Sequence, residues 1–144
     1  MAEFPPRPST LTGLVIAALE PLFPGRVFDG LVPDDVPTDA YGYVLPYVAL
    51  YSGVGGDLPM ERNLSGLADI DVTDWRAQTS VVGPSMSHAR DAAYDVQQAL
   101  TNLPIGRGWL KPDLDSFTVG EPLPDPSVTP TRFLLPLRWR LTTT

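Results

Sequence analysis

Residues 68–103 read ADIDVTDWRAQTSVVGPSMSHARDAAYDVQQALTNL, and their pattern changes from that of a strand to that of a helix. From Trp75 onward, apolar and polar side chains alternate, which is the period of a half-buried strand. The side chains predicted to point inward are Trp75, Ala77 and Val81, and those predicted to point outward are Arg76, Gln78 and Ser80. A strand that leads into an amphipathic helix predicts a two-layer core, to which the rest of the chain must add strands.

After Gly83-Pro84 the apolar residues recur every three or four positions, as on one side of a helix. Ser85 is the predicted N-cap, with Ser87 as the alternative, and Pro104 and Gly106 are predicted to end the helix. The apolar stripe comprises Met86, Ala89, Ala92, Ala93, Val96, Ala99, Leu100 and Leu103. The opposite, solvated side comprises His88, Asp91, Asp95, Gln98 and Asn102.

A first helix is predicted nearer the N-terminus, with Ser9 or Thr10 as its cap and LTGLVIAALEPLF as its body. Pro24-Gly25 ends this helix, because neither residue continues a helix well. Its predicted apolar stripe comprises Leu11, Leu14, Val15, Ala18, Leu19 and Leu22.

Strands are predicted on both sides of the central unit. Residues 43–51 (YVLPYVALY) are apolar on both faces, and their paired part should begin at Tyr47 because Pro46 has no N–H. Residues 132–141 (RFLLPLRWRL) show the clearest alternation, with every odd position apolar. Shorter strands are predicted at 26–29, 107–111 and 114–119. Loops rich in proline are predicted at 30–42 and 120–131, and a long insertion with three glycines at its start is predicted at 52–71.

These elements predict an α+β fold: a mainly antiparallel β-sheet with two helices packed on one face and long proline-rich loops. Residues 1–8 (MAEFPPRP) are predicted to be an N-terminal arm, and residues 9–144 a single domain of ordinary size. No run approaches the roughly 20 apolar residues of a membrane span, and no signal peptide is expected at the N-terminus.

Composition narrows the function classes. The chain has no cysteine, which excludes disulfides, thiolate catalysis and cysteine metal sites. Its 10 basic and 17 acidic residues give a net charge of −7. This charge argues against a protein that binds nucleic acid tightly, because phosphate binding needs a basic surface. The chain also holds 17 prolines, gathered between the predicted elements, and proline lowers the entropy that a loop loses when it is ordered by a contact.

No catalytic, cofactor-binding or metal-binding residue is predicted. The only histidine, His88, has Asp91 three positions later, and two ligands on an exposed helix side make a weak metal site. A solvated first helical turn explains the pair better, with Asp91 near the positive end of the helix dipole. The acidic groups Asp34-Asp35, Asp69/Asp71/Asp74 and Asp113/Asp115 lack the order of a calcium loop and are predicted to be solvated.

Two further groups have ordinary structural interpretations. Tyr43, Tyr47 and Tyr51 recur on one strand face, and a face covered by a helix explains them better than a stacking platform. Arg138 and Arg140 flank Trp139, and in an acidic chain we interpret the pair as a solvated strand face or a salt-bridge partner for another subunit.

The order of elements resembles that of the tail terminator (tail-completion) proteins of long-tailed bacteriophages, including the phage lambda U-like group. The resemblance extends from Leu11 to Leu141. It rests on the opening helix ending in LFPGRVFDG, the strand LPYVALYSG, the strand DWRAQTSVVG followed by the helix SMSHARDAAYDVQQAL, and the closing strand RFLLPLRWRL. Residues 53–67 and 120–131 depart from it, so no subunit contact is carried over there.

The resemblance implies a virion structural protein without catalytic residues or cofactor. It implies a hexameric ring at the head-proximal end of the tail tube, which stops tube polymerisation and joins the tail to the connector. The implied partners are other copies of the chain, the tail tube protein and the head–tail connector protein, with no membrane. DNA would pass through the lumen without specific binding, and the ring would be assembled in the host cytoplasm.

Three alternatives stay open at this point. One is a head–tail connector or head-closure protein, which is also a small ring-forming virion protein. A more distant one is a small enzyme or metal-binding protein that uses His88 and Asp91 together. The last is a monomeric binding module.

Overall fold

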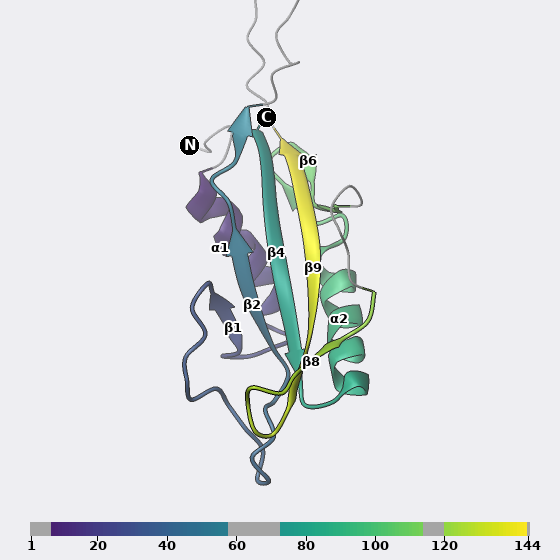
Figure 1. The fold of residues 1–144 in the computed structure, drawn as a ribbon. Coiled ribbons are helices and arrows are strands. Elements are labelled where there is room, and N and C mark those ends of the chain that lie inside the picture. Colours follow the sequence, from purple (N-terminus) through teal and green to yellow (C-terminus); the bar gives the residue numbers. More distant parts are fainter. Residues whose placement is uncertain (1–6, 58–72, 114–119, 144) are drawn as a thin grey trace, which may run out of the picture.

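The computed structural model describes residues 7–57, 73–113 and 120–143. It shows the expected α+β fold, with two helices and a mostly antiparallel sheet (Figure 1). The elements in chain order are α1 (Pro8–Leu19), β1 (Val27–Asp29), β2 (Tyr47–Ser52), β3 (Gly56–Asp57), β4 (Thr73–Gly83), α2 (Met86–Leu100), β5 (Pro104–Ile105), β6 (Gly108–Trp109), β7 (Lys111–Pro112), β8 (Leu123–Asp125) and β9 (Arg132–Thr143).

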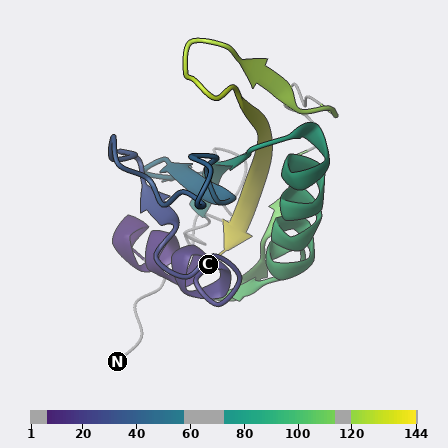
Figure 2. The same ribbon diagram turned by 90° about the horizontal axis from the view of Figure 1, so that it is seen from below.

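The main sheet has the order β1-β2-β4-β9-β7, with β3 paired to β4 and β8 paired to β9. Only the β1–β2 pair is parallel among its described pairs, and β5 and β6 form a separate two-stranded sheet. Both helices lie on one side of the main sheet (Figures 1 and 2). We call this side the inner face and the opposite side the outer face.

The core lies between the inner face and the two helices. The register aligns Val48 of β2, Val81 of β4 and Leu135 of β9 in one row, and all three are buried. Trp75 and Trp139 are the largest fully buried side chains. The indole of Trp139 donates a hydrogen bond to the hydroxyl of buried Thr79 at 2.9 Å, so its N–H is satisfied inside the core.

The junction between β4 and α2 confirms the predicted strand–helix unit. Ser85 is the N-cap, and its hydroxyl accepts a hydrogen bond from the backbone N–H of His88. Gly83 lies so close to the first turn of α2 that a β-carbon there would be 2.8 Å from the backbone nitrogen of Ala89. The chain can therefore turn from strand to helix at this point only with a glycine.

The end of α2 and one residue of its stripe differ from the prediction. The helix ends at Leu100, because Asn102 adopts a positive φ of 65° and its N–H bonds to the carbonyl of Leu110. Pro104 belongs to β5 and does not end the helix. Met86 is predicted to be in the core but is exposed. It is the first residue of α2, and the buried side of the helix begins at Ala89.

The first helix also differs in detail. It begins at Pro8, one residue inside the predicted arm, and Arg7 takes the cap position without a side-chain cap bond. Leu14 is exposed although the stripe predicted it to be buried, and Thr12 is buried in its place. The hydroxyl of Thr12 lies 2.8 Å from that of Ser52, so this polar group has a partner on β2.

Most predicted strands are present. Tyr47 begins β2, as expected from Pro46, and the alternation of β4 and β9 matches their buried and exposed sides. Residues 107–111 were predicted to be one strand but are divided between β6 and β7, because Leu110 turns back to bond with Leu103. The predicted strand at 114–119 lies outside the described residues.

The lower half of the outer face, at the start of β2 and β9, has a second small core. Its buried residues are Val36, Val44, Tyr47 and Val82, and its partly buried residues are Phe28, Val32 and Leu134. Tyr47 was expected under a helix, but the segment 30–46 covers it, because its strand position points away from α1 and α2. Tyr51 points the same way and is exposed, and Tyr43 lies outside the strand.

Candidate functional site

The upper half of the outer face is charged. Here the register places Arg76 of β4 opposite Arg140 of β9, and Lys111 of β7 opposite Arg140 on its other side. Three cations therefore form one row across three strands. Like charges in directly opposed positions destabilise a sheet, so this row needs compensating carboxylates.

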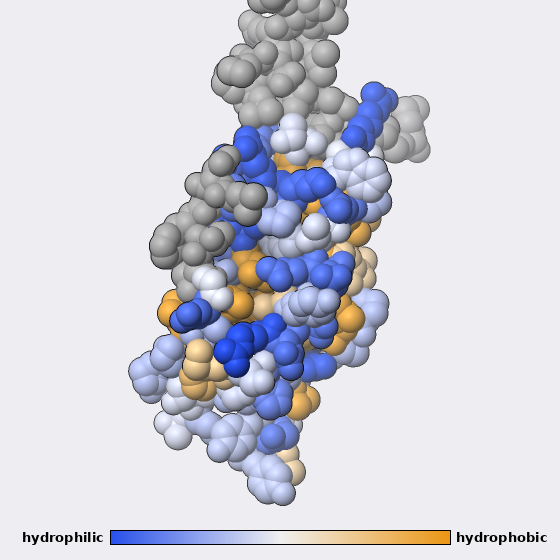
Figure 3. Space-filling view, turned by 90° about the vertical axis from the view of Figure 1, so that its right-hand side faces the viewer, coloured by the Kyte–Doolittle hydropathy of each residue, from blue (hydrophilic) through white to orange (hydrophobic). Residues whose placement is uncertain are grey.

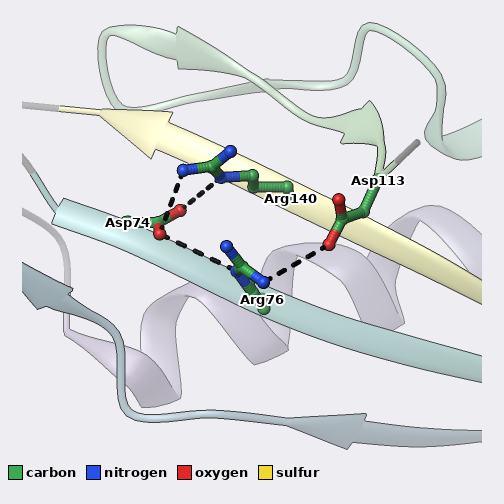
Figure 4. Close-up of polar contacts among 4 residues, drawn as sticks. All are labelled: Asp74, Arg76, Asp113 and Arg140. Atoms are coloured by element: carbon green, nitrogen blue, oxygen red, sulfur yellow. Dashed lines mark hydrogen bonds and ion pairs between the residues drawn. The ribbon is translucent and has the colours of Figure 1, made fainter. Parts of the chain in front are cut away.

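Asp74 and Asp113 provide these carboxylates (Figure 4). Asp74 accepts hydrogen bonds from Nε and Nη2 of Arg140 at 2.8 and 3.3 Å, and its second oxygen lies 3.8 Å from Nε of Arg76. Nη1 of Arg76 lies 3.8 Å from the carboxylate of Asp113. The four side chains thus alternate in sign, and Arg76 joins the two acids.

Asp113 is the most buried member of this network, with 3% of its side chain exposed. Its backbone N–H donates to the carbonyl of Arg138 at 2.9 Å, which attaches the residue to β9. Arg76, in contrast, has 56% of its side chain exposed. A buried carboxylate is costly unless it is paired, and the guanidinium tip of the half-exposed Arg76 side chain supplies a positive charge beside Asp113.

Two adjoining hollows of about 530 and 310 Å³ open on this surface and share Asp113. We define the basic face by the charged residues of the hollows and the network: Arg76, Arg107, Lys111, Arg138 and Arg140, together with Asp74 and Asp113. Trp109 lies in the wall of the larger hollow and is 55% exposed. Half of the ten basic residues of the chain therefore gather here, although the whole chain has a net charge of −7.

The acidic groups divide between two environments. Asp34 and Asp35 are exposed, as predicted for a solvated loop. That prediction is wrong for Asp74 and Asp113, because strand pairing brings arginines to both. The remaining predicted acids, Asp69, Asp71 and Asp115, lie outside the described residues.

His88 contacts Ser85 and not Asp91. Its Nδ1 lies 2.6 Å from the hydroxyl of Ser85, the same oxygen that caps α2. Within the described residues, no hydrogen bond or ion pair joins His88 to Asp91, and both side chains are exposed. The contact of His88 is thus part of the helix cap.

The described part of the chain shows two further absences. No group of three or more histidine, aspartate or glutamate side chains comes together there as metal ligands would. None of the helices in that part has the length and apolar character needed to span a membrane.

Sequence reasoning recognised the arginines of β9 but not the network that holds them. Asp74 and Arg76 share a strand face at a spacing of two, as do Arg138 and Arg140, so each pair could have been placed on one side of a strand. The contact between the pairs depends on the register of β4 against β9, which the local pattern does not define.

No protein-family model matches this chain, and no curated protein matches its sequence.

Proposed function

We propose that this chain is a virion structural protein, a phage tail terminator. It forms a ring at the head-proximal end of the tail tube, stops tube polymerisation and joins the tail to the connector. The proposal rests on the resemblance in element order together with one structural observation, the basic face, over which no described helix lies. The proposed protein needs no cofactor or catalytic residue.

The basic face supports a role in protein contact. Both helices lie on the inner face, so among the described residues no helix lies over the upper outer face. Its arginines are ordered by Asp74 and Asp113, which lowers the entropy cost of engaging them. A surface of preorganised arginines beside an exposed tryptophan, Trp109, has the residue types that are enriched where proteins bind one another.

The two edges of the main sheet are poorly suited to pairing with a strand of another subunit. Contacts between subunits are therefore expected to use faces and loops. The carbonyl of Arg138 accepts a hydrogen bond from the backbone N–H of Asp113, so the backbone groups of Arg138 point away from β4. Residues two positions apart in a strand point the same way, so the backbone groups of Pro136 also point away from β4. Proline has no N–H to offer a further strand. The edge strand β1 is only three residues long. A closed ring assembled through faces and loops fits these features better than an extended sheet between subunits.

The side that faces the viewer in Figure 3 is mainly hydrophilic, and its hydrophobic residues form separate groups. The helix α2 lies on this side of the molecule (Figure 1). A partner that contacts this side meets a largely polar surface, as expected for a subunit that folds before it assembles.

The test is assembly with and without tail tubes. The purified chain should form rings visible by negative-stain microscopy, or should do so after tail tubes are added, and it should bind one end of each tube. Added at the start of tube polymerisation, it should cap tubes and halt their growth. A chain that stays monomeric with tubes present and leaves tube length unchanged would contradict the proposal. Binding to connector without any effect on tubes would favour the head–tail connector alternative.

A further inference from the structure

We propose that neighbouring subunits of the ring bind through opposite charges, with the turn at Asp34-Asp35 of one subunit seated on the basic face of the next. This inference rests on the proposed ring and specifies its contact surface. The occupant of the basic face is therefore a second copy of this chain.

The turn at Asp34-Asp35 has the properties of a rigid acidic projection. Both aspartates are exposed, and within the described residues neither has a hydrogen bond or an ion pair. Val36, the next residue, is buried in the lower outer core, which anchors the turn to the domain. Pro33 and Pro37 flank it and restrict its backbone. Little conformational entropy is lost when such a turn binds.

No basic residue occurs in the segment 30–46, which carries Asp34, Asp35 and Asp39. Asp39 is used locally, since its side chain accepts hydrogen bonds from the backbone N–H groups of Tyr41 and Tyr43 at 2.8 and 3.0 Å. This acidic segment connects β1 to β2 and reaches the lower end of the molecule (Figure 1). Asp34 and Asp35 are thus free to pair with cations outside their own subunit.

The basic face has matching properties. It carries five cations and two carboxylates among the described residues, and the two carboxylates pair with Arg76 and Arg140. Arg138 is exposed and has no side-chain hydrogen bond or ion pair within that part of the chain. It lines the smaller hollow together with Tyr51 and Gln78, whose polar groups can hydrogen-bond an incoming carboxylate. A pair of aspartates from outside would neutralise Lys111 and Arg138, which have no ion pair with a carboxylate in the described part of the chain.

The two surfaces lie at opposite ends of the molecule. The basic face is beside the start of β4 and the end of β9, at the top of Figure 1, whereas the acidic turn precedes Val36, which packs against Tyr47 and Val82 at the other ends of the strands. Two different patches on one subunit make a heterologous contact, and such contacts generate rings when the rotation between subunits closes. Charge complementarity also fixes which surface meets which, because like charges would repel in the wrong arrangement.

The experiment uses two charge-reversed variants of the full chain. One is D34K/D35K, and the other is K111E/R138E. Each alone should raise the concentration needed for half-assembly by on the order of tenfold or more, because like charges then meet at every contact. The control D91K/D95K makes the same number of reversals on exposed positions of α2 and should assemble like the wild type. Circular dichroism of each variant checks its folding.

Mixing the two defective variants gives the decisive result. In an equal mixture, the lysine turn of one variant can bind the glutamate face of the other, and the aspartate turn can bind the arginine face. Rings should therefore return, and native mass spectrometry should show both variants in equal numbers. Wild-type rings should also weaken between about 0.05 and 0.5 M salt, as the Debye length shortens.

The contrary outcomes are distinct. The contact is wrong if the wild type forms rings and all three variants assemble equally well. It is also wrong if the two defective variants fail to form rings when they are mixed. Either result leaves the ring proposal intact. Absence of wild-type rings in the presence of tubes would overturn the proposed function itself. A further outcome is that the wild type binds duplex DNA, that K111E/R138E does not, and that both still form rings. This result would assign the basic face to DNA and overturn the proposed contact.

Discussion

The two faces of the sheet use the same strands for different purposes. On the inner face, Trp75, Val81 and Trp139 are buried against the helices. On the outer face, the alternate residues of those strands, such as Arg76 and Arg140, form an ion network at the surface. Burial of large apolar side chains contributes several kcal/mol per residue, whereas surface ion pairs contribute about 0–1 kcal/mol each. The inner face therefore carries the stability, and the upper outer face can carry specificity at little cost in stability.

The largest difference between the faces should come from tryptophan. Trp75 is fully buried on the inner face, so Trp75→Ala should lower the free energy of unfolding by about 3–5 kcal/mol. Trp109 lies on the outer side and is exposed, so Trp109→Ala should change it by less than about 0.5 kcal/mol. Urea unfolding followed by circular dichroism measures both. Similar losses in the two variants would contradict the division.

The junction between the inner face and α2 should be nearly as sensitive. Gly83→Ala places a β-carbon 2.8 Å from the backbone nitrogen of Ala89. Relieving this clash requires a shift of the helix backbone, which costs free energy. We expect a loss of about 1–3 kcal/mol in unfolding free energy. Gly13→Ala is the matched control, because a β-carbon at that position of α1 would have no heavy atom within 4 Å, and it should stabilise by up to about 1 kcal/mol. A neutral Gly83→Ala would show that the close approach is relaxed in solution.

The buried hydrogen bond between Trp139 and Thr79 on the inner face offers a finer test. Thr79→Val keeps the shape of the side chain but removes the acceptor of the Trp139 indole N–H. An unsatisfied buried donor should cost about 1–3 kcal/mol in urea unfolding. Thr79→Ser retains the hydroxyl and should cost about one methyl group, roughly 0.8 kcal/mol. If the serine variant has a lower free energy of unfolding than the valine variant, the hydrogen bond does not account for the stability at this site.

The outer network should have a smaller and salt-dependent effect on stability. Asp74→Asn removes the charge that faces both Arg76 and Arg140, and the cationic row is then only partly compensated. The expected loss is about 1 kcal/mol, since these groups are partly exposed. It should shrink in high salt. Asp34→Asn is the control and should be neutral for the isolated subunit, because Asp34 has no ion pair within the described residues.

The smallest effect concerns pH at the turn between β8 and β9. The hydroxyl and backbone N–H of Ser127 donate to the carboxylate of Asp125 at 2.5 and 3.1 Å, and these bonds lower the pKa of Asp125 below its usual 3.8. A lowered folded-state pKa means that this contribution is present above the unfolded-state value and is lost as pH falls through the folded-state value. Carbon-13 NMR titration should show the lowered pKa, and Ser127→Ala should raise it toward 3.8. An unchanged pKa in that variant would contradict the assignment.

Local periodicity was the reliable part of the sequence. The stripe of α2, the cap at Ser85 and the alternation of β9 depend only on residues a few positions apart, so their spacing alone predicts them. The errors lie at element ends and in short segments. Met86 is the first residue of α2, and Leu14 lies in the middle of α1 beside the buried stripe. Spacing alone does not reveal how far the packing surface reaches along or around a helix.

By itself, the sequence determined the α+β class, the two helices, the central strands and the inward and outward sides of β4 and β9. Only the tertiary structure decided that Asp74 and Asp113 compensate the cationic row of Arg76 and Arg140, and that the loop before β2 covers Tyr47. The physical reason is register. Periodicity assigns a side chain to a face of a strand, but Asp74 and Arg140 are 66 positions apart, and their contact exists only through the pairing of whole strands.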